Sequence, residues 1–98
     1  MRADKKKPQG FSSKGILEKA LEITQTDRRT QYGRPERNFE TIADLWSVYL
    51  GVPIKPKDVA IMQVLLKIAR VKSGMAKEDN FIDMAGYSAL AGEVQEND

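Results

Sequence analysis

Apolar residues recur at intervals of three and four positions in four separate segments of the chain, with glycine or proline between the segments. This spacing puts the apolar side chains on one face of an α-helix, and no segment alternates as a half-buried strand does. The apolar positions are Ile16, Leu17, Ala20, Leu21 and Thr24; Ile42, Leu45, Trp46, Tyr49 and Leu50; Val59, Ile61, Met62, Val64, Leu65, Leu66, Ile68 and Ala69; and Phe81, Ile82, Met84, Ala85, Ala89 and Leu90. The sequence therefore predicts an all-α fold, a compact bundle of about four helices.

Residues with strong end preferences set the expected helix boundaries. The N-terminal caps are expected at Ser12 or Ser13 for the first helix and at Asn38 for the second. Gly51 and Gly74 are expected to end the second and third helices. The first helix should fade near residues 26–29, and the fourth should cover about residues 79–92.

The third segment, about residues 56–73, has the longest apolar pattern. Pro56 suits its first helical position, and apolar residues around most of its circumference predict that this helix is central. Gln63, Lys67 and Arg70 nevertheless form a polar stripe at positions i, i+4 and i+7. The stripe is either the solvent face of the helix or a pair of inward or interfacial cations that grips phosphate, for which a lysine and an arginine are well suited.

The fourth segment has a polar face of opposite charge, made of Asp79, Asn80, Asp83 and Tyr87. Carboxylates one turn apart, such as Asp79 and Asp83, can share one Mg²⁺ or position a water molecule. In the alternative interpretation Asp79 favours the start of the helix, and Asp83 forms an ion pair with Lys67 or Arg70 across the bundle. Both interpretations remain open at this point.

Gly86 lies inside the fourth expected helix. A glycine there costs roughly 1 kcal/mol relative to alanine. Its presence indicates that another helix or a ligand approaches closely. Trp46, by contrast, belongs to an apolar stripe and is expected to pack in the core.

Composition limits the available chemistry. The 98 residues contain no Cys and no His, which excludes a thiolate nucleophile, a histidine base and a Cys/His zinc site. A metal would have to be a hard cation held by carboxylates, such as Mg²⁺. Because so short a chain has a thin core, we expect it to associate with itself, as a dimer or a tetramer.

The charge distribution divides the chain into three parts. Residues 1–14 hold a local charge of about +4, which leaves the rest near −2, since the net charge is +2. We expect a flexible basic tail at 1–12, a single helical domain at 13–93 and a frayed end at 94–98. The nearly neutral domain makes nucleic-acid binding unlikely as a main role. With no signal peptide and no membrane-spanning run, a cytoplasmic location in a bacterial host is expected.

The stretch RRTQYGRPERNF at residues 28–39 concentrates arginines around Tyr32 and a Gly–x–Pro turn. It is either a polar connection between helices or a loop that reads phosphate groups. The second interpretation requires Arg28, Arg34 and Tyr32 to fold over the faces that carry Lys67 and Asp83.

Three ordered motifs give the chain a resemblance to a known family. They are Y-G-x-P-x-x-N-F at 32–39, L-L-K-x-A-R at 65–70 and D-x-x-G-Y at 83–87. Over about residues 16–91 the chain resembles a small all-α domain of unknown function found in phage and prophage genomes. It is more loosely similar to the phage nucleotide-modification-associated domain and to the MazG-like nucleotide pyrophosphohydrolases.

The looser similarity implies a phage protein of nucleotide metabolism. MazG-like enzymes use Mg²⁺ held in E-x-x-E and E-x-x-D patterns to split nucleoside triphosphates into monophosphate and pyrophosphate. Neither pattern occurs in the expected helices, where Asp79 and Asp83 could stand in for the second. The resemblance implies either a Mg²⁺-dependent pyrophosphohydrolase or a nucleotide-binding relative. Its site would comprise Asp79 and Asp83 as catalytic and metal-binding residues, with Lys67, Arg70, Arg28, Arg34, Tyr32, Asn38 and Tyr87 contacting the substrate.

The alternative function is a non-catalytic helical module for oligomerisation or protein interaction. The short chain, the lack of His and Cys, and the missing metal motif favour it.

Overall fold

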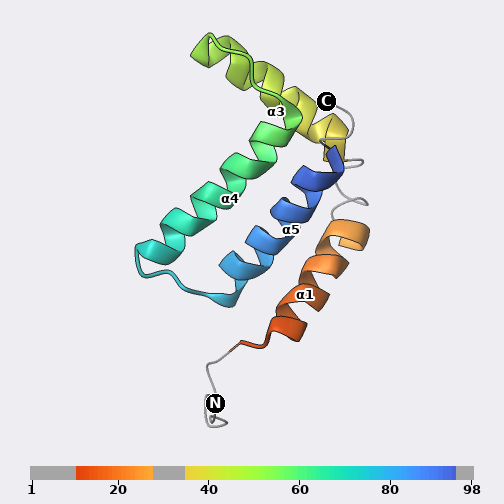
Figure 1. Cartoon of the computed structure of the whole chain (residues 1–98), viewed down its shortest axis with the longest axis vertical. Helices are drawn as coiled ribbons and strands as arrows, with labels where there is room; N and C mark the ends of the chain where they lie inside the picture. Colours follow the sequence, from red (N-terminus) through yellow and green to blue (C-terminus); the bar gives the residue numbers. More distant parts are fainter. Residues whose placement is uncertain (1–10, 28–34, 95–98) are drawn as a thin grey trace.

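The computed structural model describes residues 11–27 and 35–94, which form four α-helices and one π-helical segment with no strand among them. The elements are α1 (Ser13–Glu22), η2 (Ile23–Asp27), α3 (Pro35–Leu50), α4 (Pro56–Lys72) and α5 (Glu78–Val94) (Figure 1). The predicted all-α class and the number of helices are confirmed. Self-association stays a prediction.

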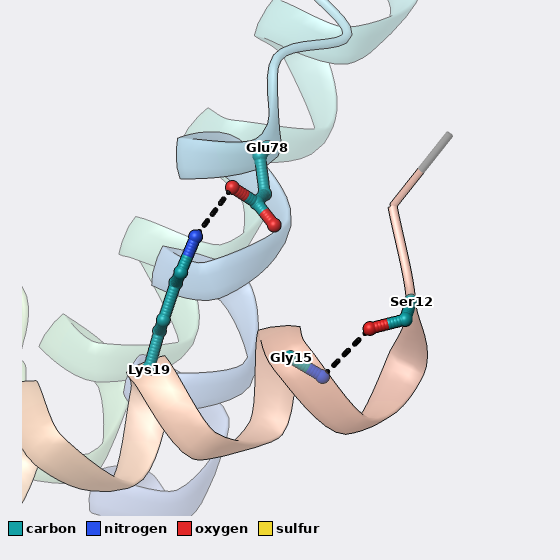
Figure 2. Close-up of polar contacts among 4 residues, drawn as sticks. All are labelled: Ser12, Gly15, Lys19 and Glu78. Carbon is teal, nitrogen blue, oxygen red and sulfur yellow. Dashed lines mark hydrogen bonds and ion pairs between the residues drawn. The ribbon is translucent and has the colours of Figure 1, made fainter. Parts of the chain in front are cut away.

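Most of the predicted helix ends are confirmed. The Ser12 hydroxyl caps α1 by accepting a hydrogen bond of 2.9 Å from the Gly15 N–H (Figure 2). Pro56 is the first residue of α4. Gly51 and Gly74 follow α3 and α4 with φ angles of 74° and 97°, a left-handed conformation that glycine adopts without steric cost.

The predicted cap at Asn38 is wrong, because α3 begins three residues earlier, at Pro35. A proline in the first turn of a helix loses no hydrogen bond, and its fixed φ angle already suits the helix. Asn38 therefore lies within α3 and is half-buried.

The predicted central position of α4 is also wrong. Figure 1 shows α5 between α4 and α1, and α5 contacts α3 as well. The buried core gathers where α3, α4 and α5 meet, and it consists of Phe39, Ala43, Val59, Ala60, Leu90, Ala91 and Val94. Trp46 packs against this core, as predicted. The helix α5 continues two residues beyond its predicted end at 92, and its last residue, Val94, is fully buried.

The C-terminal half of α3 continues beyond the bundle (Figure 1). Leu45, Tyr49 and Leu50 belong to the apolar stripe predicted for this helix, yet they are exposed. The turn after α3 is fixed by Ser47, whose hydroxyl accepts the Ile54 N–H at 2.8 Å and donates to the Ile54 carbonyl at 3.3 Å. This pair of bonds helps to set the angle between α3 and α4.

The described part of the chain begins with Phe11, whose ring centroid lies 6.0 Å from that of Phe81 on α5. Within residues 11–27 and 35–94, no helix combines the length and the apolar character that crossing a membrane requires.

Candidate functional site

The polar stripe of α4 is partly withdrawn from the solvent. Gln63 is half-buried, and the side chain of Lys67 is only 13% exposed. Arg70, one turn further on, is exposed. Of the two interpretations of this stripe, the solvent face is therefore wrong for Lys67, whose ammonium group lies between two helices.

Lys67 reaches Asp83 across the contact between α4 and α5. The Lys67 Nζ atom lies 3.0 Å from Asp83 Oδ2, and the Asp83 side chain is 34% exposed. A charge held so far from water is costly unless it is paired. Asp83 therefore compensates Lys67, as the ion-pair interpretation predicted. One side of the carboxylate still meets the solvent.

A pocket adjoins this ion pair on the side of α1 and η2. Its cavity has a volume of about 50 Å³ and opens to the solvent, and it is lined by Ala20, Ile23, Thr24, Ile82, Asp83, Gly86, Tyr87 and Leu90. Most of these side chains are apolar, with polar groups supplied by Thr24, Asp83 and Tyr87. Such a mixture of an apolar wall with a few polar groups is typical of small-molecule sites.

Gly86 allows η2 to approach α5 closely. A Cβ atom at this position would lie 3.2 Å from the Thr24 methyl group. Thr24 is buried, and its hydroxyl donates to the carbonyl of Ala20 at 2.9 Å, which restrains the side chain. The prediction that another element comes close at Gly86 is confirmed.

Tyr87 joins the pocket to the core. It lies one turn after Asp83 on α5 and lines the pocket. Its ring centroid is 6.5 Å from that of the fully buried Phe39, with the rings tilted by 43°. The position of Tyr87 is thus restrained by packing, so it can act as a rigid wall of the pocket.

Asp79 lies at the exposed start of α5, beside the contact with α1. There Lys19 bonds Glu78 at 2.8 Å (Figure 2). The hydrogen bond to Glu78 raises the pKa of Lys19 above its ordinary value of 10.5, and the charges of Glu78 and Asp79 add to this rise. The charge of Asp79 thus acts on α1, whereas Asp83 faces α4. Among the described residues, no group of three acidic side chains could surround a metal ion.

Asn80, on the same polar face, has a structural contact. Its side chain is buried, and its amide donates a hydrogen bond to the Met75 carbonyl. This bond closes the turn between α4 and α5.

Of the predicted site residues, Asp83 and Tyr87 line the pocket, and Lys67 contacts Asp83 without lining the pocket itself. Arg70, Asp79 and Asn38 do not line it either. Arg28, Tyr32 and Arg34 lie outside the described residues, so their part in the site stays a prediction.

Sequence reasoning missed the wall that α1 and η2 provide, above all Ile23 and Thr24. Thr24 was placed on the apolar face of the first helix, which signals burial. Helical spacing alone does not identify the neighbour that a buried side chain meets.

Comparison with known proteins identifies relatives in phages. The Gene 55 protein of Mycobacterium phage D29 is 43% identical over 84 residues, 86% of this chain and 56% of that protein. The Gene 55 protein of Mycobacterium phage L5 is 42% identical over 81 residues, 82% of this chain and 52% of that protein. The chain thus spans about half the length of these curated relatives. No solved structure matches. Residues 15–95 match the family described as "Domain of unknown function (DUF6378)", and the chain belongs to that family.

Proposed function

We propose that this chain is a phage protein that binds nucleotides in the host cytoplasm, with Lys67 as the main phosphate ligand. The observation that carries the proposal is the inward position of Lys67, paired with Asp83 at the edge of a pocket. A lysine that served only solubility would extend into water. Here the ammonium group is held by Asp83, which lines the pocket, so a phosphate group at the mouth beside Asp83 could reach it.

Lys67 retains hydrogen-bonding capacity for a ligand. An ammonium group has three N–H donors, and among the described residues its acceptor is Asp83. The remaining donors could bind phosphate oxygens, while Asp83 would hold the lysine in place.

The rest of the pocket suits the less polar part of a nucleotide. Its cavity of about 50 Å³ is smaller than the roughly 300–1,000 Å³ of most small-molecule sites. It would therefore admit only the edge of a base or a sugar ring, with the rest of the nucleotide at its open mouth. Tyr87 and Ile23 would contact that ring, and the phosphates would extend toward Lys67, with Arg70 as a further ligand. Arg28 and Arg34, which lie outside the described residues, stay predicted ligands.

Mg²⁺ enters the proposal together with the nucleotide. Mg²⁺ commonly binds through one or two carboxylates and the phosphates of the substrate, and it retains several water molecules. The partly exposed carboxylate of Asp83 suits one such contact. Asp79, whose charge acts on Lys19 of α1, would have to turn away from that helix to supply a second. If the chain shares the chemistry of the MazG-like enzymes, which its motifs loosely resemble, release of pyrophosphate is the reaction to test.

Titration of the purified protein with a panel of ribo- and deoxyribonucleoside triphosphates, with and without Mg²⁺, tests the proposal. We expect at least one nucleotide to raise the melting temperature, and the Lys67→Met variant to bind it at least about tenfold more weakly, a loss of ~1.4 kcal/mol. Lys14→Met, which removes an exposed lysine of α1, is the matched control and should bind normally. Pyrophosphate release is measured on the same samples.

Two results would contradict the proposal. One is the absence of any shift or calorimetric signal with every nucleotide tested. The other is equal binding by the wild type and Lys67→Met.

The exposed apolar residues of α4 favour a second function, a helical module that assembles with another protein chain.

A further inference from the structure

The outer face of α4 is apolar and exposed. Val59 and Ala60 near its start lie in the core and Lys67 pairs with Asp83 of α5, whereas five large apolar residues on the opposite side are between 36% and 57% exposed. They are Ile61, Met62, Leu65, Leu66 and Ile68. In a helix that packs on one core the apolar side faces inward. An exposed apolar face of this extent is typical of a surface that packs against another chain.

The outer face has the spacing of a helix-pairing surface. Asp58, Ile61, Leu65, Ile68 and Lys72 follow one another at alternating intervals of three and four residues. This is the spacing by which one helix packs along another. The stripe extends over α4, whose 17 residues give a length of about 25 Å.

The charges on this stripe are self-complementary. Asp58 and Lys72 each lie seven positions from Leu65, on opposite sides of it. If two copies of α4 pack antiparallel about a two-fold axis at Leu65, Asp58 of each copy lies beside Lys72 of the other. Lys72 is exposed, and Asp58, whose Oδ2 accepts the Lys55 N–H at 3.0 Å, keeps its second oxygen for such a contact.

We propose that the chain forms a homodimer in which the outer faces of two α4 helices pack antiparallel about Leu65. This interface is isologous, because each copy uses the same patch. The self-complementary ends favour a second copy over an unrelated partner. The inference is independent of nucleotide binding, because it uses the side of α4 opposite Lys67.

The exposed apolar area is sufficient for such a dimer. The projecting half of α3 lies on the side of α4 away from α5 (Figure 1), and it adds Leu45, Val48 and Tyr49, which are between 65% and 88% exposed. Together with the five residues of α4, these residues make eight. Their exposed fractions add up to between four and five fully exposed side chains, or about 450 Å² of apolar area at roughly 100 Å² each. A standard interface buries roughly 800 Å² per partner, somewhat more than half of it apolar.

Analytical ultracentrifugation of the full chain over a range of concentrations tests the dimer. We expect the wild type to sediment as a dimer. Leu65→Glu, which puts two carboxylates at the axis, should weaken dimerisation by roughly a hundredfold or more. Leu17→Glu on α1, a leucine of similar exposure (61% against 57%), is the matched control and should leave the dimer intact. Circular dichroism confirms that each variant is folded.

A charge exchange tests the antiparallel register. Asp58→Lys and Lys72→Glu should each weaken the dimer, because each brings like charges together, and the double variant should restore it. Asp58→Lys also removes a helix cap, so the dissociation constant, not the melting temperature, is compared. A double variant no tighter than either single variant would overturn this register.

A cysteine introduced at the axis gives a third measurement, because the chain has no other cysteine. Under oxidising conditions Leu65→Cys should form a covalent dimer readily, whereas Leu17→Cys should not. A monomeric wild type at every concentration would overturn the proposal, as would a dimer that Leu65→Glu leaves unchanged.

Discussion

Removing Asp83 should cost much more stability than removing Lys67. In Asp83→Ala the ammonium group of Lys67, 13% exposed, loses the carboxylate that lies 3.0 Å away. Breaking a fully buried pair costs roughly 3–5 kcal/mol, whereas exposed pairs contribute roughly 0–1 kcal/mol. Because Asp83 is about one-third exposed, we expect an intermediate loss of about 2 kcal/mol. For a domain of this size that loss lowers the melting temperature by roughly 10 °C.

Substituting Lys67 instead leaves the carboxylate of Asp83 unpaired, and water can reach that carboxylate. In Lys67→Met the apolar stem is retained, and the carboxylate of Asp83 is hydrated on its exposed side. We expect a loss of at most about 1 kcal/mol. In the double variant, Lys67→Met with Asp83→Ala, no unpaired charge remains. Its stability should therefore exceed that of Asp83→Ala alone.

The wild type, the two single variants and the double variant form a double-mutant cycle. Urea denaturation of these four proteins at neutral pH and one fixed protein concentration measures their free energies of unfolding. The expected coupling free energy is at least about 1 kcal/mol. The pair Lys19–Glu78, whose lysine side chain is 54% exposed, serves as a matched cycle and should show weaker coupling. Additive effects of the two substitutions would refute the reasoning, because they would mean that water, not Asp83, compensates the charge of Lys67.

Three further predictions concern the contacts around the site. Gly86→Val should destabilise the fold by roughly 2 kcal/mol, because the new side chain meets the buried Thr24; a melting temperature equal to that of the wild type would contradict the close contact. Ser47→Ala should cost roughly 1–2 kcal/mol in urea denaturation, since the backbone of Ile54 loses both bonds to the hydroxyl; an unchanged midpoint would mean that water replaces these bonds. Folding raises the pKa of Lys19 above 10.5, so the ion pair with Glu78 stabilises the folded state fully below about pH 10.5. This stabilisation is lost as the pH rises through the higher pKa of the folded state. The difference in melting temperature between the wild type and Lys19→Gln should thus be present at pH 8 and vanish at strongly alkaline pH, and a difference that persists there would contradict this origin.

Local signals in the sequence predicted the helices well. The Ser12 cap and the stops at Gly51 and Gly74 depend on one or two residues and their own backbone, so the sequence alone reveals them. The error at Asn38 arose from two competing start signals three residues apart. Both a proline and an asparagine favour the beginning of a helix, and the structure begins α3 at the proline.

The candidate site was predictable only in part, because it depends on which helices are neighbours. The i, i+4 spacing put Asp83 and Tyr87 on one face of α5, and the cost of a helical glycine signalled a close approach at Gly86. Neither signal identifies α1 and η2 as the opposing wall. The pairing of Lys67 with Asp83 was one of two alternatives, and only the packing of α4 on α5 decided between them.

The wrongly predicted central position of α4 shows why the hydrophobic pattern of a short chain can mislead. A stripe of polar residues on an otherwise apolar helix indicates the solvent face when a single core covers everything else. In this chain the core is small, and Lys67 finds its partner on α5 while Leu65 stays exposed on the opposite side. If a second copy covers Leu65, the apolar rule holds for the dimer, and α4 becomes central there, as its sequence predicts. The inward lysine and the exposed leucine then have one common cause, a helix whose two faces serve a site and an interface.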